Sequence, residues 1–467
     1  MDHHRAIEVL VEIERAAEVN ELRAGGLHLW PIVRLDFWAQ LLRPPAERRA
    51  SRVAARPRFG FIHRWRERGR LRALPGAEAL FLSRHEDYGD RFDGAHYNRH
   101  TDPMFAFCRA KMSCVKLEGQ ESVTSRTLPR VEPTEFVRVE HLAAEVEPVV
   151  TGSESLRRAL AELGESLAFD EANLRAQAAD LLQRRDGFLA VLDRVQPRVV
   201  FVVCYYDRRV LPLIAACRER GIPTVDIQHG KQGVYHGAYT HWTRLPEAGY
   251  ELLPDFFWLW GEASRRHIAA SQPHALKRHR PLVGGNRWLA MWRDGDAFAS
   301  PPLPARFRSA TRVILVTLQP LDPPIPPVVR EAVQRGPGDW LWLFRVHPQR
   351  RAEIPSLAAS LAGNCEFEHA STAPLYSLLR LAHRHVTCWS SVAFEADALG
   401  VPTMIVHPSG RTLYADDIAG GRFAYGKSAD ELLAWVTADT PRMEVQPYIE
   451  TSDRRADDAL AEILAPR

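Results

Sequence analysis

Short apolar runs alternate with longer amphipathic stretches along this chain, most regularly after Pro197. Residues 198–204 form a continuous apolar, β-branched run that predicts a buried strand, and residues 209–220 predict a helix that ends at Gly221. Residues 222–227 predict the next strand, so the three segments form a βαβ unit, which implies a parallel sheet with a right-handed crossover. The same series includes predicted elements at residues 79–83, 154–192, 256–260, 262–270 and 280–283.

A second α/β series follows a polar, proline-rich stretch at residues 293–311, which we interpret as a linker. Its predicted strands are 313–318, 340–346, 365–369, 385–388 and 403–406, and its helices include 374–382 and 391–399. We therefore predict an α/β fold of two Rossmann-like, doubly wound domains facing a cleft, residues 1–292 and 312–467, the second with C-terminal helices. The length of 467 residues also exceeds what one core usually serves. Ligands bind at the carboxyl ends of strands in such sheets, so we expect the site there.

Composition describes an ordinary globular chain. Hydrophobic residues make up 46%, and Lys plus Arg exceed Asp plus Glu by only three, which argues against a nucleic-acid partner. The six cysteines include no CxxC pair, and neither a signal peptide nor an apolar run of about 18 residues is present. We expect a cytoplasmic protein. The basic segment described next leaves peripheral association with the inner face of the cell membrane as an open alternative.

Residues 43–72 form a basic segment with eleven Arg and two Glu. Runs of charge are usually solvated surfaces, which is one interpretation. The other is contact with anionic lipid headgroups or a lipid-diphosphate acceptor, with Phe59, Phe61, Ile62 and Trp65 as apolar partners.

Ser390 and Ser391 directly follow the predicted strand 385–388 and open a helix. Free backbone N–H groups and hydroxyls at such a position can bind a nucleotide diphosphate, although a serine at a helix start is also a routine N-cap. Glu395 lies one turn later on the same face and can accept from ribose hydroxyls. Arg345 and His347 end the predicted strand 340–346 and could neutralise charge on a leaving diphosphate, or simply cap the strand.

Gln228-His229-Gly230 ends the βαβ unit. Gly230 permits a tight turn or a close backbone approach, and His229 is the first candidate for a base that takes a proton from an acceptor hydroxyl, although a lone histidine is often structural. The polar loop 93–103 offers Asp93 and Asp102 as alternative bases and Arg99 as an anion contact, unless it is only solvated. The triplet Asp294-Gly295-Asp296 lies in the predicted linker rather than after a strand, so we predict no metal site.

At these motifs the chain resembles the GT-B glycosyltransferases of bacterial surface polysaccharides, a group that includes polysialyltransferases, Kdo transferases and CDP-glycerol glycerophosphotransferases. The matching residues are 228–230, 345–348 and 387–395. The resemblance implies an inverting, metal-independent transfer from a nucleotide-activated sugar to a glycan or lipid-linked acceptor, with no cofactor. It assigns donor phosphates to His347, Ser390 and Ser391 and makes His229 a catalytic candidate. By their positions in the first half of the chain, we expect Gln228, Gly230 and Arg99 on the acceptor side. Arg345 stands where several of these families have a lysine-proline pair, which leaves the donor open.

Three alternatives share these features. A CDP-glycerol-type glycerophosphotransferase would have a similar donor site, and a non-hydrolysing sugar-nucleotide epimerase shares the two-lobed architecture. A non-catalytic assembly scaffold is the third alternative, although the retained His229, His347 and Glu395 favour an enzyme.

Overall fold

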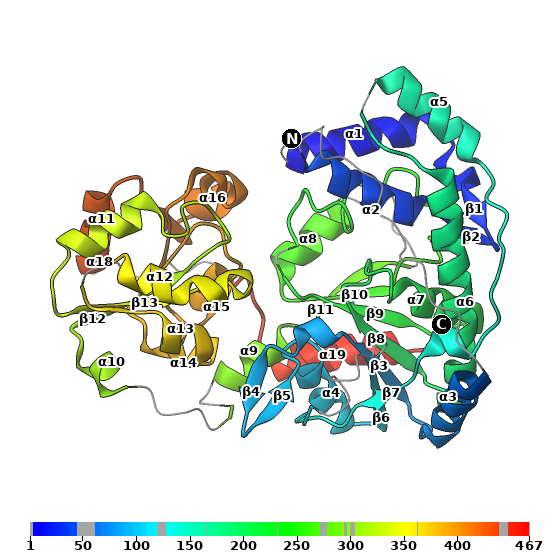
Figure 1. Ribbon diagram of the computed structural model, residues 1–467, viewed down its shortest axis with the longest axis horizontal. Helices are drawn as coiled ribbons and strands as arrows, with labels where there is room; N and C mark the ends of the chain where they lie inside the picture. The colour runs from blue at the N-terminus through cyan, green and yellow to red at the C-terminus, as the bar shows by residue number, and fades with distance from the viewer. Residues whose placement is uncertain are drawn as a thin grey trace. The chain divides into compact units, whose positions relative to one another are not determined.

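The computed structural model describes residues 3–43, 61–118, 128–164, 166–230, 232–270, 278–293, 297–298, 304–361, 363–438 and 447–466. The chain divides into two compact units (Figure 1). The first comprises Met1–Trp288 and Ser452–Arg467, and the second comprises Leu289–Thr451. None of the described helices combines the length and apolar character that a membrane span requires.

A seven-stranded sheet in which all neighbours are parallel forms the centre of the first unit. Its strand order is β11-β10-β9-β8-β3-β6-β7. Numbered along the chain within this sheet, that order is 7-6-5-4-1-2-3, so it contains the order of a Rossmann fold. The strands are β3 (Ala79–Ser83), β6 (Cys114–Glu118), β7 (Glu135–Phe136), β8 (Val199–Val203), β9 (Thr224–Ile227), β10 (Phe256–Leu259) and β11 (Arg280–Val283).

Alternate residues of these strands enter two different cores, as the period of two in a strand requires. Leu80 and Val200 belong to a core shared with the N-terminal helices, whereas Phe81 and Phe201 belong to a second core. The helices of this unit are α1 (His3–Ala16), α2 (Trp30–Leu41), α3 (Phe61–Ala73), α4 (Asp102–Arg109), α5 (Ser153–Leu163), α6 (Glu171–Val195), α7 (Leu211–Arg220), α8 (Glu262–Ala270) and α19 (Asp453–Leu464). Two small antiparallel pairs, β1 (Arg23–Ala24) with β2 (Leu27–His28) and β4 (Asp90–Phe92) with β5 (Ala95–Tyr97), complete the unit.

A six-stranded, fully parallel sheet forms the centre of the second unit. Its order, β14-β13-β12-β15-β16-β17, is 3-2-1-4-5-6 along the chain, the Rossmann order. The strands are β12 (Arg312–Thr317), β13 (Trp340–Arg345), β14 (Cys365–Glu366), β15 (Arg384–Thr387), β16 (Thr403–Ile405) and β17 (Phe423–Tyr425). The helices are α9 (Arg287–Arg293), which spans the boundary, α10 (Ala305–Ser309), α11 (Pro327–Arg335), α12 (Ile354–Ala359), α13 (Glu368–Thr372), α14 (Leu375–Leu381), α15 (Val392–Ala398), α16 (Pro408–Leu413), α17 (Ala415–Ala419) and α18 (Ala429–Thr437).

The prediction of two Rossmann-like α/β halves is confirmed, and several boundaries differ. The predicted helix 154–192 is two helices, because Gly164 ends α5 in the left-handed conformation, at φ 64°. The predicted strand 365–369 covers only β14 before the chain turns into α13. Part of the predicted linker 293–311 is helix α10, whose Phe307 is fully buried.

The last helix belongs to the first unit, although the predicted second domain extended to residue 467. Ala456, Ala459, Leu460 and Ile463 of α19 pack in the core that contains Phe81 and Phe201. Arg280 at the start of β11 also pairs with Glu462. Periodicity along α19 predicts an apolar face but does not say which sheet that face will cover.

Candidate active site

The carboxyl ends of β3 and β8 meet at the point where the strand order of the first sheet reverses. These neighbours are the first and fourth strands of the sheet along the chain. Connections leave such a point in opposite directions, which opens the crevice where doubly wound sheets bind ligands. The residues that follow the two strands, Arg84 and Cys204, therefore begin the candidate site of this unit.

A network of ion pairs lies at this switch point. Arg84 donates to both carboxylate oxygens of Asp87, at 2.9 and 2.7 Å. Arg209 donates to Asp207 through Nε at 2.9 Å and Nη2 at 2.5 Å, and to Glu86 at 2.6 Å. Burial alone would raise the pKa of Asp207, but the hydrogen bonds from Arg209 lower it below its ordinary value. Asp207 is therefore held as an ionised partner of Arg209 and is poorly suited to act as a base.

The turn after β8 has a strained backbone that Asp226 holds in place. Cys204 adopts a left-handed φ of 57°, which is uncommon for a residue other than glycine. The buried Asp226 carboxylate accepts from the Tyr205 backbone N–H at 3.0 Å and from the Tyr239 hydroxyl at 2.8 Å. Burial raises the pKa of Asp226 to about 7. This turn carries Tyr206 to the sheet edge beside His229.

His229 follows β9, the neighbour of β8, and its imidazole is partly enclosed. Its Nε2 lies 3.4 Å from the Tyr206 hydroxyl, and the ring of His100 meets it edge-on with centroids 6.1 Å apart. Nδ1 is buried and has no hydrogen-bond partner in the described part of the chain. Burial, reinforced by His100 and the positive charge of Arg84, lowers the pKa of His229 to about 3. The imidazole is therefore neutral at physiological pH, with one ring nitrogen unengaged.

Gln228 fixes the turn that carries His229. Its side-chain oxygen accepts from the Trp260 backbone N–H at 2.7 Å, and its amide nitrogen donates to the Gly230 carbonyl at 2.8 Å and Ser264 Oγ at 3.2 Å. The side chain is buried, so Gln228 supports the site rather than facing an acceptor. Gly230 has no left-handed φ, and a Cβ added there would meet nothing within 4 Å. The predicted tight turn is therefore not why glycine stands there, and the space beside its Cα is open.

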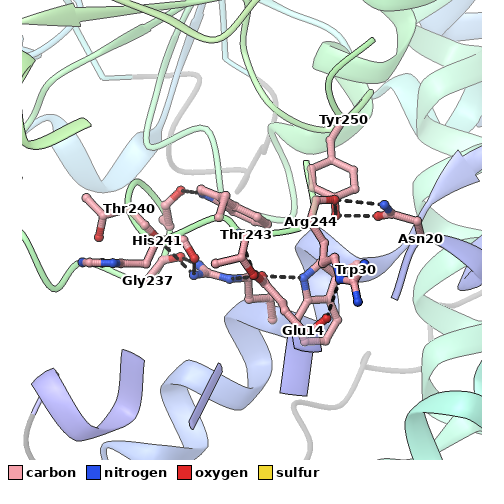
Figure 2. A network of polar contacts seen from close by, with 12 residues as sticks. Glu14, Asn20, Trp30, Gly237, Thr240, His241, Thr243, Arg244 and Tyr250 are labelled. Atoms are coloured by element: carbon pink, nitrogen blue, oxygen red, sulfur yellow. Dashed lines mark hydrogen bonds and ion pairs between the residues drawn. The ribbon is translucent and has the colours of Figure 1, made fainter. Parts of the chain in front are cut away.

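The segment that follows this turn is anchored by the N-terminal helices (Figure 2). The fully buried Arg34 guanidinium of α2 donates to the carbonyls of Thr240 and His241, each at 3.0 Å, and to Gly237. It also donates through Nε to Glu14 of α1 at 2.9 Å. Helices that precede the sheet in sequence thus hold the connection between β9 and β10.

The structure argues against both aspartate alternatives to His229 as the base. Asp93 and Gly94, with φ of 50° and 78°, form the exposed two-residue turn of the β4–β5 hairpin, which the Asp-Gly pair favours. The Asp102 side chain is fully buried, accepts from Lys116 Nζ at 2.5 Å and from the Asn98 backbone N–H at 2.9 Å, and so anchors the start of α4. Arg99 is exposed in the loop between β5 and α4, next to His100, whose ring contacts His229.

In the second unit the order reverses between β12 and β15, and Thr387 Oγ1 donates to the Thr317 carbonyl across this point at 3.0 Å. Ser390 and Ser391 lie three and four residues after the end of β15 and are partly exposed. Ser390 Oγ accepts from the Val392 backbone N–H at 3.3 Å, whereas Ser391, the N-cap residue of α15, makes no capping hydrogen bond with its side chain. The sequence thus placed the serine pair at the edge where this fold binds ligands.

The other predicted donor residues have different surroundings. Arg345 donates to the carbonyls of Ala370 at 3.0 Å and Ala373 at 2.7 Å, at the C-terminal end of α13, so its guanidinium holds this helix. The Glu395 side chain is buried and accepts a hydrogen bond from the Tyr376 hydroxyl. His347 is partly exposed, its Nδ1 accepts from the Gln349 backbone N–H at 3.4 Å, and burial lowers its pKa.

The first unit thus brings His229 together with Gln228, Gly230 and the loop that carries Arg99. In the second unit the serines lie at the sheet edge, whereas Arg345 and Glu395 are hydrogen-bonded to other groups. Sequence reasoning did not single out Arg84, Asp87, Tyr206, Asp207 and Arg209, all of which lie within five residues of the ends of the predicted strands 79–83 and 198–204. Among the described residues no group of three or more His, Cys, Asp and Glu side chains could hold a metal ion. The triplet 294–296, most of the segment 43–60 and part of the linker lie outside the described residues.

No protein-family model and no curated protein matches the sequence. Among solved structures, the UDP-GlcNAc 2-epimerase of Neisseria meningitidis, bound to UDP-GlcNAc, is 13% identical to this chain with a TM-score of 0.48. The match covers 83% of this chain and 99% of the epimerase chain. The UDP-GlcNAc 2-epimerase of Methanocaldococcus jannaschii is 12% identical, with a TM-score of 0.46 and coverages of 83% and 98%. A glycosyltransferase of kitacinnamycin is 14% identical, with a TM-score of 0.39 and coverages of 83% and 93%. At these identities and TM-scores the likeness assigns no activity to this chain.

Proposed function

We propose that this chain is a glycosyltransferase of the GT-B type that moves a sugar from a nucleotide-activated donor to a hydroxyl of a glycan or lipid-linked acceptor. The observation that carries the proposal is the placement of His229 just after β9, at the carboxyl edge of a Rossmann sheet, with its Nε2 3.4 Å from the Tyr206 hydroxyl. An imidazole held there can take the proton of an acceptor hydroxyl once the negative charge of a bound donor diphosphate raises its pKa from about 3. A second sheet of Rossmann order, with hydroxyls at its switch point, supports a nucleotide-sugar donor.

The reaction is a single displacement that inverts the anomeric carbon. The acceptor oxygen forms the new glycosidic bond while the bond from the anomeric carbon to the donor phosphate oxygen breaks. The His229 imidazole takes the acceptor proton, and the nucleoside diphosphate leaves with the bonding electron pair. Tyr206 and the Gln228 turn hold the imidazole in position.

On the donor side we assign the diphosphate to Ser390, Ser391 and His347, whose hydroxyls and imidazole N–H can donate to it. Glu395 is buried and accepts from the Tyr376 hydroxyl, so we assign it to the packing of α15 rather than to the ribose. Arg345 acts by holding the end of α13 rather than by contacting phosphate. No cofactor beyond the donor is required, and a lipid-linked acceptor would bring the enzyme to the inner face of the cell membrane.

The test screens CMP-, CDP-, UDP- and GDP-activated donors with EDTA present, measuring nucleotide release together with product analysis. We expect one donor class to be cleaved with retained activity in EDTA, and His229→Ala to lower turnover by roughly 10²–10⁴-fold with nearly unchanged donor affinity. His4→Ala, on an exposed residue of α1, is the matched control and should be unaffected.

Each alternative gives a different result in the same screen. Release of an epimerised sugar nucleotide without an acceptor identifies an epimerase, and transfer of glycerol phosphate from CDP-glycerol identifies a glycerophosphotransferase. Absence of nucleotide binding by calorimetry identifies a scaffold. Normal turnover of His229→Ala removes the base assignment.

A further inference from the structure

Helix α3, Phe61–Ala73, packs against the first unit beside α6 and the turn Val139–His141 (Figure 1). Leu74, at its end, is buried in the core, and Leu71 packs against the same core. The inward face of the helix is therefore set by Leu71, Leu74 and Glu67, which lie within about one sixth of the helix circumference at 100° per residue.

The only acidic residue of the described helix is turned inward. Glu67 is 4% exposed, accepts from the Arg70 guanidinium at 2.6 Å, and accepts from the Arg138 backbone N–H at 3.0 Å. Its negative charge is therefore satisfied on the protein side, together with the positive charge of Arg70. Neither residue contributes a net charge to the outer face.

Arg64, Arg68 and Arg72 follow one another at intervals of four residues, so they advance by about 40° each and line one exposed stripe. Trp65 lies beside Arg68 and Arg72 on this stripe, at positions i+3 and i+7, and is 69% exposed. No ion pair joins these three arginines to an acidic side chain within the described parts of the chain. The outer face thus presents three uncompensated guanidinium groups and an indole.

We propose that this face of α3, made of Arg64, Trp65, Arg68 and Arg72, docks on the surface of an anionic phospholipid bilayer. The positive stripe complements headgroup phosphates, and an exposed tryptophan prefers the boundary between headgroups and acyl chains. The chain as a whole has an excess of only three positive charges, so the attraction is local to this helix. A nucleic acid is the other polyanion that the positive stripe could bind. It offers the exposed Trp65 indole no apolar layer, so the indole favours the bilayer.

The experiment is sedimentation of the full-length protein with vesicles of phosphatidylcholine and phosphatidylglycerol, compared with phosphatidylcholine alone. We expect binding only to the anionic vesicles, weakened by salt, with Arg64→Gln, Arg68→Gln and Arg72→Gln together lowering the partition coefficient on the order of 100-fold, roughly fivefold per arginine. Trp65→Ala should lower it further. The test uses no donor, so it does not depend on the proposed transferase activity.

The matched control removes the same three charges from scattered, exposed positions of the same unit: Arg158→Gln, Arg266→Gln and Arg454→Gln. This variant should sediment within a few-fold of the wild type. Equal losses in the two triple variants would mean that only net charge matters and would overturn the assignment of α3. Loss of single-stranded RNA binding by the stripe variant, with vesicle binding unchanged, would assign the face to nucleic acid instead.

Discussion

Replacing Glu14 by Gln tests whether the buried ion pair anchors the segment after His229. The carboxylate accepts from Trp30 Nε1 and Arg34 Nε, both at 2.9 Å, through one oxygen. Its other oxygen accepts from the Thr243 backbone N–H at 2.7 Å and from the Thr243 hydroxyl. Both Glu14 and Arg34 are fully buried. Figure 2 shows the polar network around Glu14. All four donors therefore depend on a group with two acceptor oxygens.

Glutamine keeps the shape but has only one acceptor oxygen. If its amide nitrogen faces Thr243, the hydroxyl can reverse and accept, but the Thr243 backbone N–H loses its partner. In the other orientation, Trp30 and Arg34 both face a donor. Either way one or two buried donors are left unsatisfied, at about 1–3 kcal/mol each, and the Arg34 charge loses its counter-ion. We expect Glu14→Gln to lower the free energy of unfolding of the first unit by about 3–5 kcal/mol.

Urea unfolding followed by circular dichroism measures this loss. Asp193→Asn is the matched control, because it breaks an exposed pair in which Arg220 donates to Asp193 at 2.8 and 2.9 Å, and such pairs contribute only about 0–1 kcal/mol. The double variant Glu14→Gln with Arg34→Met should cost less than the sum of the two single changes, because it leaves no isolated charge. A Glu14→Gln loss as small as that of the control, or strict additivity, would refute the reasoning.

Two further predictions concern the second unit. His385 is fully buried between Thr317 Oγ1 at 2.9 Å and Thr403 Oγ1 at 3.0 Å, and burial lowers its pKa to about 3. The unfolded chain binds this proton near pH 6.5 and the folded chain does not, so stability is complete above pH 6.5 and falls as pH decreases toward 3. The loss from this residue is about 2 kcal/mol at pH 5. His385→Asn should therefore lose less stability between pH 7 and pH 5 than the wild type does, when the free energy of unfolding is measured in urea. An equal loss in the variant and the wild type would contradict this prediction. Ser390→Ala with Ser391→Ala should weaken nucleotide binding by about 1–3 kcal/mol in calorimetry, because two donors to phosphate are lost. Unchanged affinity in a folded double variant would exclude this phosphate site.

Local pattern determined the secondary structure that repeats along the chain. The runs at 79–83, 198–204 and 256–260 are almost entirely apolar because both faces of a parallel sheet are covered, and each became a strand within two residues of the prediction. The order of strands and helices also determined that the sheets are parallel. It placed His229 and Ser390 at carboxyl ends of strands, because a residue that directly follows a parallel strand lies at that edge.

Tertiary structure decided what the polar residues near those edges do. Asp102 looks like a free carboxylate in the sequence, but Lys116 lies 14 positions away along the chain and is its partner only because β6 pairs beside β3. Arg345 looks like a phosphate ligand, but its Nη1 donates to two carbonyls at the end of α13. The sequence showed a basic segment, whereas folding decided that Glu67 faces inward and that Arg64, Arg68 and Arg72 face out. Spacing along a chain fixes which residues share a face of an element, but the partner that this face meets depends on contacts between distant segments.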